Sequence, residues 1–146
     1  MYKEYEYFLN HKSPMVFINV DAMEENFGDS YCNKKQAKAL VEILKYLIDE
    51  IPDFSTAPKD LGLISPYSGQ VQMLKQVLKE NDLTNEMELV KTIDSWQGRE
   101  CGVVMFSTVR SNIDNVIGFL ENLRRLNVAL TRAQRGLIVV GNAETL

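Results

Sequence analysis

Residues 103–109 read Val-Val-Met-Phe-Ser-Thr-Val, an almost wholly apolar run with no alternation of apolar and polar side chains. A strand with this pattern is buried on both faces, as in a parallel sheet with helices packed on each side. We predict strands at residues 15–20, 61–65, 88–93, 103–109 and 137–140. This pattern indicates an α/β domain.

Amphipathic stretches lie between the predicted strands. Residues 33–50 have helical spacing of apolar side chains, and Asn33 is suited to the N-cap. We predict a second helix at 68–80, capped by Ser68, and a third at 119–134. Because the helices alternate with strands, we expect a mainly parallel sheet with helices on both faces.

The composition is that of one globular domain. The chain has 146 residues, of which 45% are hydrophobic and 25% are charged. Cys32 and Cys101 are far apart, which argues against a disulfide framework or a zinc site and favours an intracellular setting, nuclear or cytoplasmic. No apolar run reaches the roughly 18 residues of a membrane span, so we expect no membrane partner. Residues 1–14 fit neither pattern and are interpreted as a lead-in from a longer chain, ahead of a domain at 15–146.

The charge is unevenly distributed. The net charge of −4 argues against a nucleic-acid binder. All six arginines, however, lie between Arg99 and Arg135, whereas every lysine lies at or before Lys91. A guanidinium group offers a bidentate fork for phosphate that an ammonium group lacks. The segregation is therefore either local bias or a placement of arginine for phosphate binding.

The carboxyl ends of the predicted strands point to three segments, because ligands of open parallel sheets bind there. Residues 65–70 (Ser-Pro-Tyr-Ser-Gly-Gln) are either a phosphate-binding turn or simply a capped turn. Residues 92–100 contain hydroxyls, a glycine and a carboxylate, and are either a ligand loop or a surface loop. Within them, Trp96 is expected in the core rather than as a stacking platform. The third segment is 107–112.

The predicted helix at 119–134 places two arginines in register. Arg125 and Arg132 lie two turns apart and could reach one polyphosphate. The alternative is a solvated face on which Arg125 pairs with Glu121. The sequence has no GxxxxGK[ST] phosphate loop and no cluster of residues typical of a metal site.

Taken in order, these segments resemble the second half of the motor of superfamily 1 helicases, nearest the nonsense-decay and senataxin-like 5′-to-3′ group. Residues 64–67 with Gln70 are similar to motif IV, residues 90–100 to motif V, and residues 124–133 to motif VI. The resemblance covers residues 14–146 and extends to 107–112 and 117–120. It implies the three-layer, RecA-like fold of the P-loop NTPases.

The resemblance also implies roles in nucleotide binding. Arg132 corresponds to the arginine that contacts the γ-phosphate across a domain cleft, and Arg125 supports it. Glu100 would bind the ribose, next to Gln97 and Gly98, where the glycine lets the loop approach closely. No metal ligand is expected in the chain.

The nucleic-acid contacts implied by the resemblance lie in motifs IV and V. Thr92 and Ser95 would contact the backbone of single-stranded RNA or DNA, with Ser65 and Tyr67 as further contacts. Three positions depart from the family pattern. Gln134 stands where a basic residue is usual, Cys101-Gly102 replaces a charged pair, and Trp96 replaces a smaller aromatic residue.

The implied activity is that of half an enzyme. ATP with Mg²⁺ would be bound mainly by a first RecA-like domain of the same polypeptide, so the chain alone is expected to lack ATPase activity and to be a monomer. One alternative is a non-catalytic nucleic-acid-binding or scaffold domain that keeps the fold. The other is an unrelated nucleotide-binding α/β domain, in which Arg125 and Arg132 would face solvent away from the strand ends.

Overall fold

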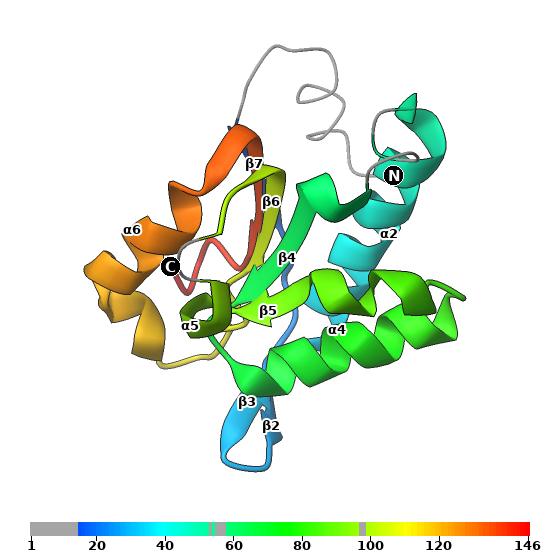
Figure 1. Cartoon of the computed structure of the whole chain (residues 1–146). Coiled ribbons are helices and arrows are strands. Elements are labelled where there is room, and N and C mark those ends of the chain that lie inside the picture. The colour runs from blue at the N-terminus through cyan, green and yellow to red at the C-terminus, as the bar shows by residue number, and fades with distance from the viewer. Residues whose placement is uncertain (1–14, 53, 55–57, 97–98) are drawn as a thin grey trace.

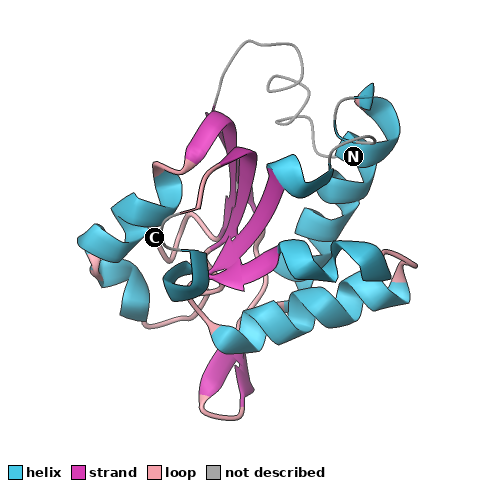
Figure 2. Ribbon diagram, in the orientation of Figure 1, coloured by secondary structure: helices cyan, strands magenta, loops and turns pink. Residues whose placement is uncertain are grey.

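The computed structural model describes residues 15–52, 54, 58–96 and 99–146. Its core is a sheet in the order β1-β7-β6-β4-β5, in which every pairing is parallel (Figures 1 and 2). The strands are β1 (Met15–Asn19), β4 (Leu61–Ser65), β5 (Val90–Thr92), β6 (Cys101–Ser107) and β7 (Ala133–Gly141). The predicted parallel α/β sheet is confirmed, whereas the expected lead-in at 1–14 lies outside the described residues.

Helices cover both faces of this sheet. One face carries α2 (Lys34–Glu50), α4 (Ser68–Glu80) and the 3-10 helix η2 (Thr84–Leu89). The other carries α5 (Ile93–Trp96), the 3-10 helix η3 (Gly118–Glu121) and α6 (Leu123–Leu130). A short 3-10 helix, η1 (Pro58–Asp60), precedes β4. No helix among the described residues is long and apolar enough to cross a membrane.

The continuous apolar run in β6 is explained by burial on both faces. Val103 and Met105 belong to the core beneath α2 and α4, and Val104 and Phe106 to the core beneath α6. A register shift between Cys101 and Val103 breaks the alternation, so these two side chains enter opposite cores although they are two positions apart.

The two predicted helix caps have different outcomes. The side chain of Asn33 accepts a hydrogen bond from the Gln36 amide, which confirms it as the N-cap of α2. Ser68, in contrast, is the first residue of α4, and the N-cap position is held by Tyr67, whose side chain makes no capping hydrogen bond to the described residues. The Gly69 amide instead donates to Ser30 Oγ at 3.1 Å. Ser30 belongs to an antiparallel hairpin, β2 (Glu25–Phe27) and β3 (Ser30–Cys32), that the sequence patterns did not predict.

The long helix predicted at 119–134 is wrong. After η3, α6 ends at Leu130, where Thr131 Oγ1 donates to the Asn127 carbonyl at 2.7 Å. β7 already begins at Ala133, which pairs with Cys101, so strand pairing takes the residues that would have extended the helix. The strand expected at 88–93 is limited to Val90–Thr92, because η2 reaches Leu89 and α5 begins at Ile93.

Candidate functional site

Arg132 and Glu100 are brought together by adjacent strands. Glu100 directly precedes β6, and Arg132 lies in the turn before β7. Because β6 and β7 are parallel neighbours, their amino ends lie side by side. Arg132 Nη1 is 3.9 Å from Glu100 Oε1. The Cys101 amide donates to the Arg132 carbonyl at 3.3 Å, which joins the two segments through the backbone.

The charges of this pair remain accessible. The Glu100 side chain is 59% exposed and that of Arg132 is 32% exposed. At 3.9 Å and with this exposure, the ion pair contributes at most about 1 kcal/mol. Arg132 Nε is buried and has no hydrogen-bond partner among the described residues. Gln134 Nε2 donates to Glu100 Oε2 at 3.1 Å, so a neutral amide holds the carboxylate at the position where a basic residue was expected. Both charged groups are therefore available to a ligand.

Arg125 lies on α6 and faces a different partner from the one expected. Its Nη2 atom is 3.4 Å from Asp94 Oδ2 on α5, whereas the sequence suggested Glu121. Arg125 and Arg132 do not stack on one helix face, because α6 ends before Arg132. Arg125 instead ties α6 to α5.

Thr92 and Ser95 form a pair of hydroxyls at the surface, at the carboxyl end of β5. Thr92 Oγ1 donates to Ser95 Oγ at 3.0 Å, and the Ser95 amide donates to Thr92 Oγ1 at 3.3 Å. Ser95 is exposed and Thr92 is half-buried. The hydroxyls bond to each other at the surface and could exchange this bond for one to a phosphate oxygen.

Ser65 and Tyr67 do not belong to this surface. Ser65 is completely buried and Tyr67 is 3% exposed. Ser65 Oγ accepts from the Tyr67 amide, and the Tyr67 hydroxyl accepts from the Phe119 amide at 3.3 Å. Their contact with nucleic acid stays a prediction, and in this conformation both polar groups are used inside the domain.

The candidate residues divide between two edges of the sheet, whereas the strand-end rule places ligands at one. Thr92 and Ser95 lie at the carboxyl edge, and Glu100 and Arg132 at the amino edge. Gln97 and Gly98 lie outside the described residues. The alternative of an unrelated nucleotide-binding domain expected Arg125 and Arg132 to face solvent away from the strand ends. Arg132 lies at the amino edge and faces the Glu100 carboxylate, which does not decide between the two interpretations.

A cavity of about 620 Å³ lies beside Glu100. Its lining includes Lys59, Glu86, Trp96 and Arg99, so charges of both signs surround it. Trp96 is 6% exposed, which confirms it as a core residue. Its ring fills the space above Gly62, where an added Cβ would lie 2.5 Å from the indole Cη2 atom.

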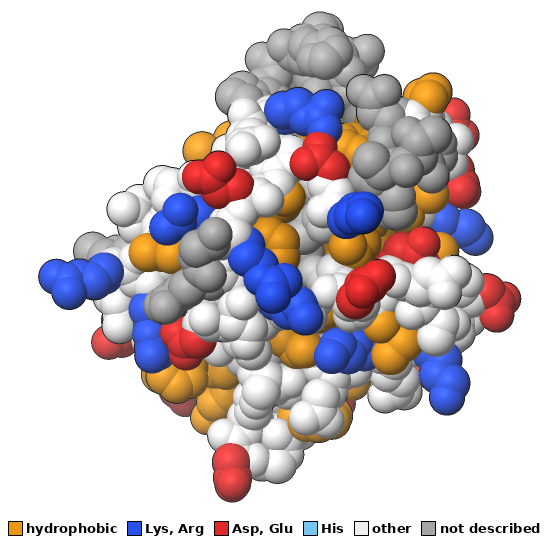
Figure 3. Space-filling view, in the orientation of Figure 1, with side chains coloured by type: hydrophobic (Ala, Val, Ile, Leu, Met, Phe, Trp, Pro, Cys, Tyr) orange, Lys and Arg blue, Asp and Glu red, His pale blue; other side chains and the backbone are white. Residues whose placement is uncertain are grey.

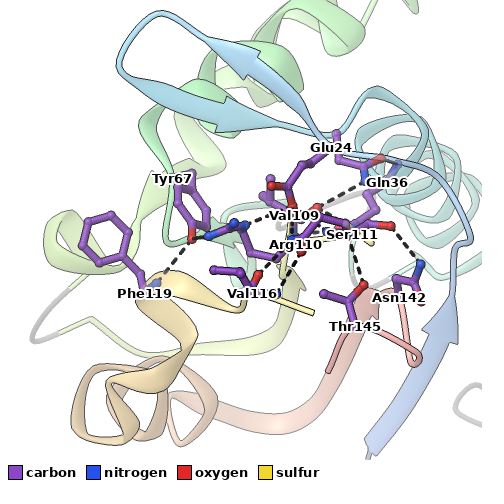
Figure 4. Close-up of polar contacts among 12 residues, drawn as sticks. Glu24, Gln36, Tyr67, Val109, Arg110, Ser111, Val116, Phe119, Asn142 and Thr145 are labelled. Atoms are coloured by element: carbon purple, nitrogen blue, oxygen red, sulfur yellow. Dashed lines mark hydrogen bonds and ion pairs between the residues drawn. The ribbon is translucent and has the colours of Figure 1, made fainter. Parts of the chain in front are cut away.

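Arg110, a buried arginine at the carboxyl edge, was not predicted from the sequence as part of a site (Figure 4). Arg110 Nε donates to Glu24 Oε2 at 3.0 Å, and Arg110 Nη1 donates to the Tyr67 hydroxyl at 3.2 Å. Its guanidinium lies 4.5 Å from the centre of the Tyr31 ring. Arg110 is in the segment 107–112 that the strand-end rule indicated, but no pattern identified Glu24 as its partner.

Two glutamines add buried polar contacts at this edge. Gln36 Oε1 accepts from both the Ser107 hydroxyl and the Val109 amide, each at 2.9 Å. Gln70 Nε2 donates to Ser107 Oγ at 3.0 Å. Val109 has a φ of +68°, which is unfavourable for a β-branched residue. The bonds from Gln36 help to hold this strained backbone in place.

The surface charge is mixed. On the face seen in Figure 3, Lys and Arg side chains are interspersed with Asp and Glu. On this face, a nucleic acid would therefore be held by local contacts rather than by a broad basic surface. The described part of the chain contains no group of three or more His, Cys, Asp or Glu that could hold a metal ion.

Comparisons with known proteins agree with the resemblance. Residues 2–144 match the model of a family described as "AAA domain". The chain is 39% identical over 142 residues to the Regulator of nonsense transcripts 1 of Dictyostelium discoideum, and 36% identical over 138 residues to the DNA polymerase alpha-associated DNA helicase A of Saccharomyces cerevisiae. It is 39% identical over 134 residues to the human protein named Probable helicase senataxin.

These matches cover most of the chain but a small part of each relative. They span 92%, 92% and 90% of this chain, but only 10%, 20% and 5% of the respective relatives. The likeness is therefore to one domain of much longer proteins.

Proposed function

The chain belongs to the AAA domain family, as a C-terminal helicase domain of the group that includes the regulators of nonsense transcripts and senataxin, and from this we propose that it supplies half of an ATPase site. The other half would be a first RecA-like domain with a phosphate loop. The whole polypeptide would be an ATP-dependent helicase or translocase on RNA or DNA.

The observation that carries this proposal is the juxtaposition of Arg132 and Glu100 at the amino edge of the sheet. A guanidinium with a weak partner can move to a polyphosphate, where it stabilises the charge that develops during phosphoryl transfer. A carboxylate beside it can accept hydrogen bonds from ribose hydroxyls. The donor set therefore fits a nucleoside triphosphate whose Mg²⁺ is held mainly by the other domain. The bound triphosphate supplies the phosphoryl group that is transferred to water.

Asp94 and Arg125 connect the amino edge of the sheet to the surface at Thr92 and Ser95 that would bind the single-stranded nucleic acid, here called the strand track. Ser95 and Asp94 lie on α5, while Arg125 lies on α6, which leads into the turn with Arg132. Contacts from Thr92 and Ser95 to phosphates would provide affinity without reading sequence. Such contacts do not discriminate RNA from DNA unless a 2′-hydroxyl is recognised.

The test compares the chain alone with the chain joined to a first RecA-like domain. We expect ATP hydrolysis, stimulated by single strands, only in the joined polypeptide. There, Glu100→Gln should raise the KM for ATP roughly 5- to 30-fold with kcat retained. The hydrogen bond to a charged group contributes about 1.5–3 kcal/mol, and the neutral bond that replaces it contributes about 0.5–1.5 kcal/mol.

The matched control is Glu42→Gln, at an exposed position of α2, which packs on the face of the sheet opposite to α5 and α6. It should leave KM unchanged. Robust turnover by the 146-residue chain alone would contradict the half-site. A joined polypeptide that binds strands but never hydrolyses ATP would instead support a scaffold.

A further inference from the structure

Phe119 is an aromatic residue that the proposed site leaves unused. It lies in η3, and its side chain is 55% exposed. The polar residues Glu121, Asn122 and Arg124, which are all exposed, follow it in the chain. Polar side chains therefore follow the ring along the chain, whereas the exposed apolar residues Ile113 and Val116 precede it.

The ring is held in place from beneath. The Phe119 amide donates to the Tyr67 hydroxyl, and the two ring centres are 5.4 Å apart at an interplanar angle of 52°. Tyr67 is in turn fixed by Arg110, and its ring meets that of Tyr31 edge-on at 5.6 Å. Figure 4 shows the Phe119 ring beside the Tyr67 ring, at the margin of this network. The exposed ring is thus oriented in advance by buried groups.

The ring lies at the same sheet edge as the exposed hydroxyl pair. Ser65, at the end of β4, is in register with Thr92, at the end of β5. Tyr67 follows Ser65 closely and contacts Phe119. Ile93, next to Thr92, packs in the same apolar cluster as Leu120, which is next to Phe119. η3 and α5 therefore pack on the same face of the sheet.

We propose that Phe119 is a stacking platform for one base of the single strand whose phosphates contact Thr92 and Ser95. This inference rests on the proposed function and adds a base contact to it. Proteins that bind single strands without sequence preference combine backbone contacts with exposed rings, because every base has a flat π-face. Phe119 offers such a ring, with its orientation set before binding.

The experiment measures the affinity of the chain for fluorescein-labelled oligo(dT) and oligo(U), and for an abasic strand of the same length. Salt is kept low, because binding through phosphates weakens as salt rises. We expect Phe119→Ala to weaken binding of oligo(dT) and oligo(U) roughly 5- to 150-fold, which corresponds to the about 1–3 kcal/mol of one stacked base. Binding of the abasic strand should not change.

Three further variants identify the cause. Phe119→Tyr keeps a ring and should keep the affinity. Tyr67→Phe removes the hydroxyl that orients Phe119 and should give a smaller loss, confined to strands with bases. Phe17→Ala removes a ring of similar exposure, 40%, from β1 at the opposite side of the sheet, and should have no effect.

The outcomes separate this inference from the proposed function. Ser95→Ala should weaken binding of normal and abasic strands alike, because it removes a phosphate contact. If Ser95→Ala has this effect while Phe119→Ala binds oligo(dT) and oligo(U) like the parent, the stacking platform is wrong and the proposed strand track stands. An equal loss on abasic and normal strands in Phe119→Ala would also overturn stacking. If no variant changes strand binding, the proposed function itself fails at this edge, and the ring serves another partner such as a protein.

Discussion

Replacing Glu24 by leucine is expected to destabilise the domain severely, because it leaves the buried charge of Arg110 without its partner. Glu24 Oε2 accepts hydrogen bonds from Arg110 Nε, the Ser111 amide at 2.7 Å and Asn112 Nδ2 at 3.1 Å. The side chains of Arg110 and Glu24 are 7% and 11% exposed. Removing one partner of a buried ion pair costs about 3–5 kcal/mol, since the other charge is left without compensation.

A glutamine at the same position provides the graded comparison. Glu24→Gln keeps an oxygen that can accept these bonds but removes the charge. Hydrogen bonds to charged groups contribute about 1.5–3 kcal/mol and neutral ones about 0.5–1.5 kcal/mol, so a loss of about 1–2 kcal/mol is expected. Urea unfolding followed by circular dichroism measures both variants, with the slope of the transition as a check on two-state behaviour.

The pH dependence of the free energy of unfolding tests the contact between Glu24 and Arg110 independently. Burial raises the pKa of Glu24, but the hydrogen bonds from Arg110, Asn112 and the Ser111 amide outweigh it, and the net pKa lies below its ordinary value of 4.5. A carboxyl whose pKa is lowered by folding contributes stability that is present above pH 4.5 and is lost as the pH falls through the folded-state pKa. The stability gap between the parent and Glu24→Gln should therefore narrow in acid. A Glu24→Leu variant within about 1 kcal/mol of the parent at pH 7 would refute the reasoning.

Three other predictions concern packing and reactivity. Gly62→Ala should cost about 1–3 kcal/mol in urea unfolding, because the new Cβ meets the Trp96 ring, and an unchanged midpoint would show that the ring moves freely. Burial and the nearby Asp60 carboxylate raise the pKa of Cys101 to about 12, so a disulfide reagent at pH 8 should label it only as fast as the domain opens. Asn33→Ala should lower the free energy of unfolding by about 1–2 kcal/mol, because the N-cap of α2 is lost, and thermal melts of the variant should show it.

Strands buried on both faces were predictable because their composition alone reports that burial. β4 and β6 are buried throughout and have no polar side chain before their final serines, Ser65 and Ser107, and the helices α2 and α4 show clear amphipathic spacing. The end of α6 was not predictable from periodicity. The strand that replaces the helix is stabilised by pairing between Ala133 and Cys101, a contact between distant residues. The short β2–β3 hairpin was not predicted for a similar reason, because it is held by a contact between distant residues, the hydrogen bond from the Gly69 amide to Ser30 Oγ.

The site shows a similar division. Helical spacing suggested that Arg125 and Arg132 share a face, and the helix end between them makes this wrong. The resemblance to helicases identified Arg132 and Glu100, and the structure places them together through parallel strand pairing. Arg110 and Glu24 carry no local signal, because their importance comes from burial that only the folded chain creates.

The central claim, that Arg132 completes an ATPase site supplied by another domain, is tested most directly by Arg132→Ala in the chain joined to a first RecA-like domain. We predict that kcat falls roughly 10³- to 10⁵-fold, the range for loss of an arginine finger, while binding of single strands is retained. The matched control is Arg124→Ala, an exposed arginine of α6, which should hydrolyse ATP at the parent rate. Turnover by Arg132→Ala within a few-fold of the parent would contradict the account.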